Sequence, residues 1–390
     1  MTLSRWAERE VASGGWIRRM FLEGQRLRAL HGDDAVADLA LGQPLDPEPT
    51  VSEAFRKAAA ETQHGRFAYM PNCGYPDVRQ RVAEDVGVDG VDARCVALTC
   101  GAAGAICVAL RAFVEPGLEV VGLAPYFPEF RLYAETSQHR FVSVPSRDDG
   151  GFDVDAIASA LTPSTGAVLI NTPNNPSGHV ITDEEMRDLA EVLKTHNVQY
   201  KRKVLLVVDE VYRRLIYPPA KRIEPLDHYE HTVLARSFSK DIGIAGERVG
   251  YLVLHPSMVS ADVERGIEMC MRALGFVNAP ATAQRALLHL PTWEIDLAPY
   301  RERRDLMLAG LNAAGLEAAS PHGGLYLWVK SPWDDTLQYI DALAKERTLF
   351  SPGIAFGVAS HFRICFSVPL ASIRLANATL KKLSKESRPA

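Results

Sequence analysis

The sequence predicts an α/β fold: a mostly parallel mixed sheet with helices on both faces, joined to a smaller α+β domain. Between about residue 95 and residue 255, short apolar runs bounded by glycine, proline or asparagine alternate with helical stretches. This alternation is typical of βαβ units, whose parallel strands are buried on both faces and read as continuous apolar runs. The chain is also 390 residues long, which is more than one hydrophobic core usually accommodates.

Six apolar runs are the expected strands of the large domain: 96–98, 119–122, 167–170, 204–208, 233–235 and 249–254. The expected elements of the small domain are an amphipathic helix at 16–30, a long charged helix at 293–314, and strands at 323–329 and 362–366. We therefore expect a large domain over 46–284. The small domain is expected to combine 1–45 with 285–390.

Composition argues against several classes of function. The chain is 47% apolar and 23% charged with a net charge of −5, and it has no basic patch interleaved with aromatic residues, so we expect no nucleic-acid partner. The charged N-terminus and the lack of an apolar run of about 18 residues indicate neither a signal peptide nor a membrane helix. The six cysteines form no CxxC pair, which favours free thiols in the cytoplasm and gives no indication of a metal site.

One lysine has an unusual setting. Lys240 follows two serines, Ser237 and Ser239, and precedes a stretch with two glycines that leads to Arg248. Hydroxyls, glycines and an arginine around a lysine are typical of an amine beside a phosphate pocket, where an aldehyde can be bound covalently. Taken alone, this residue could also be an ordinary solvated lysine.

Other polar residues follow the expected strands. Asn175 comes after the run at 167–170, Asp209 follows the run at 204–208, and Tyr212 lies three residues further on. Because ligands of parallel sheets bind beyond the carboxyl ends of the strands, we expect these side chains to meet at one edge. Taken alone, Asp209 could instead be a helix N-cap and Asn175 a turn residue.

These residues supply the groups that a pyridoxal phosphate site requires. Lys240 provides the amine, Asp209 can keep the pyridine nitrogen protonated, and Tyr212 and Asn175 can donate to the phenolic oxygen. A helix start and three side chains form the expected phosphate cradle: Gly101, Ala102, Ala103, Ser237, Ser239 and Arg248. Arg363, inside an apolar strand, is expected to bind the substrate carboxylate in a bidentate manner.

The sequence resembles the class I/II aminotransferases among the fold-type-I pyridoxal phosphate-dependent enzymes. The resemblance runs from Gly42 to Arg363 and rests on four segments in combination: Asn-Asn-Pro-Ser-Gly at 174–178, Asp-Glu-Val-Tyr at 209–212, Ser-Phe-Ser-Lys at 237–240 and Gly-Glu-Arg-Val-Gly at 246–250. It implies that Lys240 forms the covalent bond to the cofactor and then carries the proton between the substrate carbon and the cofactor.

The resemblance also implies roles for three other residues. Phe127 occupies the position whose ring stacks on the cofactor, although the adjacent Tyr126 is an alternative. Tyr69 matches a tyrosine that reaches the phosphate of the neighbouring subunit, which implies a homodimer with shared active sites. At Gly42 the backbone approaches the substrate.

The activity implied by the resemblance is transfer of an amino group from an α-amino acid to a 2-oxo acid by a ping-pong route. The same segments occur in relatives that catalyse β/γ-elimination, replacement or ring formation, including reactions of S-adenosylmethionine-type substrates, so this alternative stays open. A regulator without enzymatic activity is disfavoured, because too few residues precede Gly42 for a DNA-binding module.

Arg272 is a further candidate substrate ligand. In relatives that act on acidic substrates, an arginine near this position binds the side-chain carboxylate, but here its spacing to Asn278 is off by one residue. The alternative is an arginine that stabilises the end of a helix.

Overall fold

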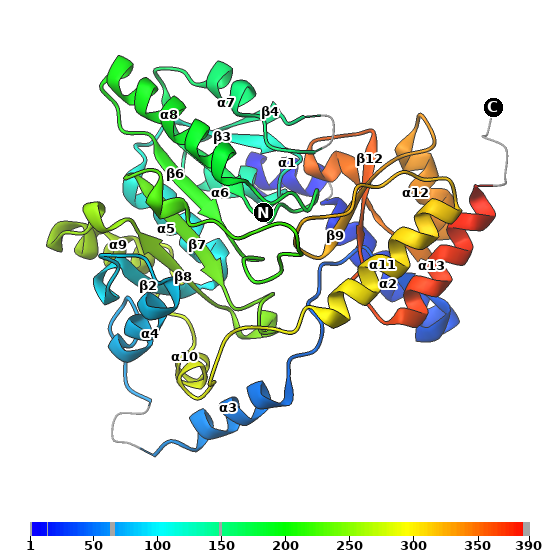
Figure 1. The fold of residues 1–390 in the computed structure, drawn as a ribbon, viewed down its shortest axis with the longest axis horizontal. Coiled ribbons are helices and arrows are strands. Elements are labelled where there is room, and N and C mark those ends of the chain that lie inside the picture. The colour runs from blue at the N-terminus through cyan, green and yellow to red at the C-terminus, as the bar shows by residue number, and fades with distance from the viewer. Residues whose placement is uncertain (1, 14, 63–66, 148–149, 385–390) are drawn as a thin grey trace. The chain divides into compact units, whose positions relative to one another are not determined.

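The computed structural model describes residues 2–13, 15–62, 67–147 and 150–384. Contacts between Cα atoms divide the chain into two units (Figure 1). The first contains the residues up to Gln43, Asn175–Gly178 and the residues from Asp296 onward; the second contains Pro44–Asn174 and His179–Ile295. Each unit is described separately below.

The second unit is built on a seven-stranded sheet. Its strands are β2 (Val96–Cys100), β3 (Glu119–Ala124), β4 (Arg140–Pro145), β5 (Thr165–Asn171), β6 (Leu205–Asp209), β7 (Thr232–Ser237) and β8 (Val249–Leu254). They lie in the order β2-β8-β7-β6-β5-β3-β4. All neighbours are parallel except β8, which runs antiparallel to β2 and to β7. This confirms the predicted mixed, mostly parallel sheet.

Helices cover both faces of this sheet. They are α3 (Pro49–Ala60), α4 (Pro76–Val86), α5 (Gly101–Phe113), α6 (Glu129–Thr136), α7 (Val154–Ala160), α8 (Asp183–Tyr200), α9 (Ala261–Ala273) and α10 (Ala281–Leu288). Successive strand residues point to opposite faces, so Val207 joins a core with α5 and α9, whereas Val208 joins a core with α4, α8 and α10. Helix α8 begins with a capping box between Thr182 and Glu185.

The first unit contains helices and short strands. They are α1 (Arg5–Ser13), α2 (Trp16–His31), β1 (Ala37–Asp38), α11 (Ala298–Ala313), β9 (Tyr326–Lys330), α12 (Thr336–Lys345), β10 (Thr348–Leu349), β11 (Ser351–Pro352), β12 (His361–Cys365) and α13 (Leu370–Leu383). Strands β11, β12 and β9 form an antiparallel sheet, and β1 pairs with β10 in parallel. The α+β character expected for this part is therefore observed.

Two details of the predicted elements were wrong. Helix α11 begins at Ala298 and not at Trp293, because Pro299 favours the first turn of a helix. Trp293 instead packs its ring against Phe238 in the core of the second unit, with 4.8 Å between ring centroids. Strand β4 was not predicted, because it is a partly exposed edge strand and lacks a continuous apolar run.

Candidate active site

Apart from Tyr69, the predicted cofactor-binding residues of the second unit lie on, directly before or shortly after strands that reach one edge of its sheet. The parallel strands β5, β6 and β7 end there at Asn171, Asp209 and Ser237, and Asp209 pairs in register with Asn171. Antiparallel pairing brings β2 and β8 to the same edge, since Cys100 lies opposite Val249. Residues far apart in sequence therefore meet where parallel sheets bind their ligands.

Asp209 combines burial with an unsatisfied acceptor. Its side chain is buried, and Oδ1 has no hydrogen-bond partner. Burial raises the pKa of Asp209 to about 8, although the backbone N–H of Val211 acts in the opposite direction. The backbone carbonyl of Asp209 accepts hydrogen bonds from Asn171 Nδ2 at 2.9 Å and from the Thr172 N–H at 3.0 Å. A carboxyl group in this setting favours a cationic or N–H-bearing partner.

Lys240 lies in the segment that follows β7. Its side chain is half-buried, whereas those of Ser237, Ser239 and Tyr212 are buried. The N–H of Ser239 donates to Ser237 Oγ at 3.3 Å, and the N–H of Phe238 donates to the carbonyl of Val249 at 3.1 Å. These contacts hold the two serines beside the start of β8.

The start of α5 and Arg248 form the predicted phosphate cradle. Gly101 has a φ of +71°, and a Cβ at this position would lie 2.5 Å from Nη2 of Arg248. A Cβ at Gly250 would lie 2.6 Å from Cα of Gly101, so the start of the helix packs directly on the backbone of β8. The first N–H groups of α5, from Gly101, Ala102 and Ala103, have no partners within the helix. Together with the guanidinium they suit an anion.

Substituting Gly101 by alanine is expected to weaken this cradle. The left-handed backbone costs an alanine about 1–2 kcal/mol of folding free energy, and the added methyl group displaces Arg248. Cofactor affinity should fall about tenfold or more, which corresponds to about 1.4 kcal/mol. Gly117→Ala is the matched control, because Gly117 has a φ of +87° and nothing within 4 Å of its Cβ position. An equilibrium titration with the cofactor should show weaker binding for Gly101→Ala alone.

The aromatic residues after β3 point to different neighbours. Phe127 packs edge-on against Phe130, with centroids 5.7 Å apart, whereas Tyr126 packs against Phe141 at 4.9 Å. Tyr133 of α6 was not predicted as part of the site. Burial raises its pKa, the charges of Glu129 and Asp209 add to the effect, and Arg248 opposes it. Tyr133 is therefore close enough to the buried carboxyl and to the cradle to interact with both.

Three other residues of this unit lie at its surface. Tyr69 is fully exposed at 105% and Phe67 at 93%. Arg272 is exposed in the last turn of α9, which fits the alternative of a helix-end arginine. The loop after this helix is tied to the segment that follows Tyr69, because Asn278 Nδ2 donates to the carbonyls of Pro71 and Asn72.

Three of the predicted substrate ligands belong to the first unit, namely Gly42, Asn175 and Arg363. Asn175 contacts Arg363 directly, and Gly42 lies against Tyr326, whose ring packs on Arg363. Arg363 is buried on β12 and donates from Nη1 to Asn175 Oδ1 at 3.0 Å and from Nη2 to the carbonyl of Ala40 at 2.5 Å. Nη2 also lies 3.3 Å from Ser351 Oγ, and Nε has no partner.

Two rings flank this guanidinium. Its Cζ lies 4.3 Å from the ring centroid of Tyr326 and 4.7 Å from that of Phe356. Only a glycine fits at Gly42, because a Cβ there would overlap the hydroxyl of Tyr326. Arg363 is thus held in one orientation, with Nε still able to donate. A bidentate contact with a carboxylate stays a prediction.

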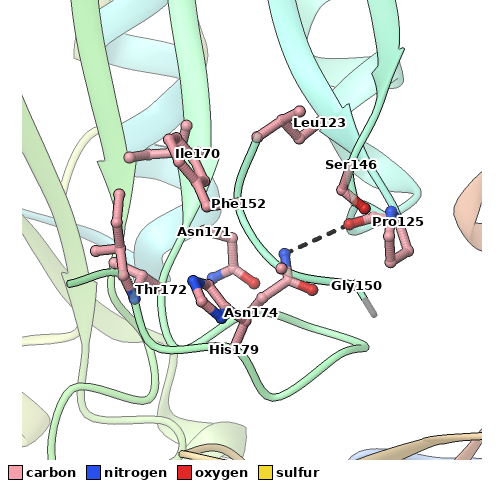
Figure 2. Close-up of a pocket in the computed structure, with 12 residues that line it drawn as sticks. Leu123, Pro125, Ser146, Gly150, Phe152, Ile170, Asn171, Thr172, Asn174 and His179 are labelled. Carbon is pink, nitrogen blue, oxygen red and sulfur yellow. Dashed lines mark hydrogen bonds between the residues drawn. The ribbon is translucent and has the colours of Figure 1, made fainter. Parts of the chain in front are cut away.

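Figure 2 shows a small cavity near the ends of β3 and β5 in the second unit. Asn174, His179 and Pro125 line it, and Asn174 Nδ2 donates to the carbonyl of Pro125 at 3.4 Å. The space that the centre of a water molecule can reach is about 20 Å³, which is room for about one water. Asn171 also lines the cavity, which is too small for a cofactor.

Among the residues that the structure describes, no helix is long and apolar enough to cross a membrane, and no group of three or more His, Cys, Asp or Glu side chains could hold a metal ion. All six cysteines are free thiols.

Comparison with known proteins gives consistent similarities. Residues 34–378 match the family model described as aminotransferase class I and II. The chain is 31% identical over 362 residues to a probable aspartate/prephenate aminotransferase of Thermus aquaticus, covering 88% of this chain and 90% of that protein.

Two solved structures are also similar. An amino transferase of Eubacterium rectale has a TM-score of 0.91 at 26% identity and covers 99% of both chains. The aspartate aminotransferase of Thermus thermophilus with maleate has a TM-score of 0.86 at 26% identity, covering 98% of this chain and all of that one at 100%.

Proposed function

This chain belongs to the aminotransferase class I and II family of pyridoxal phosphate-dependent transferases, and we propose that the two clusters described above carry its chemistry. The enzyme acts on an α-amino acid and a 2-oxo acid, as the family does. The observation that carries the assignment of residues is the buried Asp209 carboxyl with its unpartnered Oδ1 at the ligand-binding edge of the sheet.

The residues of this edge fit pyridoxal phosphate. The cofactor's protonated ring nitrogen is the kind of partner that Asp209 Oδ1 favours, and a phosphate suits the N–H groups of α5 with Ser237, Ser239 and Arg248. We propose that Tyr212 and Asn175 donate to the phenolic oxygen and that Phe127 covers the ring. When bound, the cofactor withdraws electrons from the substrate carbon that loses its proton.

The remaining steps belong to the protein. Lys240 would provide the amine that holds the cofactor; once the amine of the substrate has displaced it, the free lysine amine would accept the proton from the substrate carbon and move it towards the cofactor. A protonated ring nitrogen beside Asp209 would favour the ionised form of this carboxyl group, and the carboxylate would in turn keep that nitrogen protonated. Arg363 and Asn175 orient the substrate through its carboxylate, and Gly42 keeps that position free of a side chain.

A single-turnover experiment tests the type of reaction. The holoenzyme is incubated with an amino acid and no 2-oxo acid, and the aminated cofactor, pyridoxamine phosphate, is quantified. Transamination gives about one equivalent per site and then stops. Continuous release of product without this cofactor form would instead show β/γ-elimination, replacement or ring formation, including on an S-adenosylmethionine-type substrate.

Arg272 tests the class of substrate. If it binds a side-chain carboxylate, Arg272→Ala should raise KM for aspartate and glutamate by about ten- to a hundredfold, which is the value of a charge-assisted hydrogen bond, and leave KM for alanine unchanged. Arg265→Ala, also exposed on α9, is the control. Equal effects on the three amino acids would leave Arg272 as a helix-end residue.

We also propose a homodimer with shared sites, supported by the exposed rings of Tyr69 and Phe67. Neither Lys240→Ala nor Tyr69→Ala should be active alone. A mixture of the two unfolded and refolded together should regain about a quarter of wild-type activity, because half of the dimers are mixed and each mixed dimer has one intact site. No recovery, in a mixture shown to contain mixed dimers, would contradict shared sites.

Two further points stay proposals. We propose a large domain over 46–284 and a small domain over 1–45 and 285–390. The change of unit between Gln43 and Pro44 supports the first boundary, whereas the later change of unit falls between Ile295 and Asp296. We also propose a cytoplasmic location, which the six free thiols support.

A further inference from the structure

A buried network of charges lies directly after two of the proposed site residues. Arg214, two residues after Tyr212, donates from Nη1 to Asp241 Oδ2 at 2.7 Å. Asp241 is the residue that follows Lys240. Arg214 Nη2 also lies 2.5 Å from both oxygens of Asp85, near the end of α4. The network thus joins the segment after β6, the segment after β7 and helix α4.

Other charged and aromatic groups surround Arg214, Asp241 and Asp85. Arg213 Nη1 donates to the same Asp85 carboxylate at 2.7 Å. Arg214 Nε lies 3.7 Å from an oxygen of Glu294, and its guanidinium lies 6.0 Å from the ring centroid of Trp293. The Tyr251 hydroxyl also interacts electrostatically with Arg214. Burial raises the pKa of Asp241, and the positive charges of Arg214 and Arg213 act against this.

Stability alone explains such a network poorly. The side chains of Arg214 and Asp241 are each only 1% exposed, so both charges are removed from water. The desolvation of a buried ion pair offsets most of its attraction, and apolar residues of similar volume are often as stable. An ion pair with short hydrogen bonds differs from such packing in fixing both the distance and the direction between two segments.

We propose that the Arg214–Asp241 pair, anchored on Asp85, is a positioning device that fixes the segment carrying Lys240 against the segment carrying Tyr212. This inference rests on the proposed roles of these two site residues. Lys240 and Asp241 are adjacent, so a displacement of Asp241 moves the backbone that holds the amine. In this proposal the three charged residues are positioning residues, which act on the chemistry through their neighbours.

The test compares Asp241→Asn with Ile157→Ala. Ile157 is a fully buried residue of α7, a helix that contacts α8, β3 and β4. In the sheet, β3 and β4 are separated from β7 by β5 and β6. Both variants are purified as holoenzyme. The measurements are Tm, kcat and KM for an amino acid, and the pH midpoint of the absorption band of the lysine-bound cofactor.

Both variants should melt at lower temperature. For Asp241→Asn we expect kcat to fall about ten- to a hundredfold, as for a reacting group displaced by up to about 1 Å, with KM within about threefold and a shifted pH midpoint. Ile157→Ala should keep the wild-type kcat and midpoint. The inference is overturned if Asp241→Asn keeps them too.

A double variant separates positioning from stability even where single variants fold poorly. In Arg214→Met/Asp241→Leu the buried charges are replaced by apolar groups, and Tm should return towards the wild-type value, while kcat stays at least about tenfold low. Recovery of kcat together with Tm would reduce the pair to a structural role. The proposed function has separate readouts, namely the single-turnover yield of aminated cofactor in the wild type and the absorption band of Lys240→Ala, and neither depends on the Arg214–Asp241 pair.

Discussion

Lys240→Ala is expected to abolish the absorption band of the lysine-bound cofactor at neutral pH and to lower kcat by at least about 10²–10⁴-fold. The band needs the covalent bond to the ε-amino group, and the rate needs a positioned group that moves the proton. The half-buried side chain in the segment after β7, beside the buried Ser237 and Ser239, is the structural reason for choosing this lysine.

The measurement is an absorption spectrum of the reconstituted protein, followed by steady-state kinetics. Lys203→Ala is the control, because Lys203 is an exposed lysine of the same unit, before β6. It should leave the spectrum and the rate unchanged. An unaltered band in Lys240→Ala would mean that another amine binds the cofactor.

Asp209→Asn should have opposite effects on activity and on the stability of the cofactor-free protein. Activity should fall about 10²–10³-fold, the usual cost of losing one fixed electrostatic partner in a site. Stability of the cofactor-free protein should rise at neutral and alkaline pH, because an amide removes the cost of ionising a buried carboxyl group.

Proton linkage determines how the stability of the cofactor-free protein changes with pH. Burial raises the pKa of Asp209 from 3.8 to about 8, so the folded protein binds this proton more tightly than the unfolded chain. The wild type therefore loses stability as pH rises from about 4 to about 8, by at most about 6 kcal/mol. Asparagine does not titrate, so the advantage of the variant should grow over this range and level off above it.

Urea denaturation of both cofactor-free proteins at pH 5 and pH 8 would measure this difference, since other titrating groups largely cancel between them. An advantage equal at the two pH values would show that the carboxyl of Asp209 titrates normally. The loss of activity is measured separately on cofactor-loaded protein.

Most of the sheet was predictable because its strands are buried on both faces. Each of the runs at 96–98, 119–122 and 204–208 lies within an observed strand or overlaps it. The expectation that Asp209 and Lys240 follow the carboxyl ends of neighbouring strands required only the parallel topology of the sheet. Strand β4 was not predicted because the prediction relied on continuous apolar runs, and a partly exposed edge strand contains fewer apolar residues.

The parts of the site that could not be predicted depend on long-range contacts. Asp85 and Arg214 are 129 residues apart in sequence, and nothing near either residue indicates that they pair. Tyr133 reads as an ordinary aromatic residue of an amphipathic helix; only the fold brings it within the influence of Asp209 and Arg248. The sequence around a residue indicates its type of environment, but its partner in the fold depends on residues that are distant in sequence.

The backbone contact between Gly250 and Gly101 limits how this site can vary in evolution. A side chain on residue 250 would meet Cα of Gly101 at 2.6 Å and the carbonyl oxygen of Arg236 at 2.7 Å, and neither can rotate away. Neighbouring positions of the same strand can exchange one apolar residue for another by repacking a helix. Residue 250 is therefore expected to remain glycine in relatives that act on other substrates, while other positions of the site change.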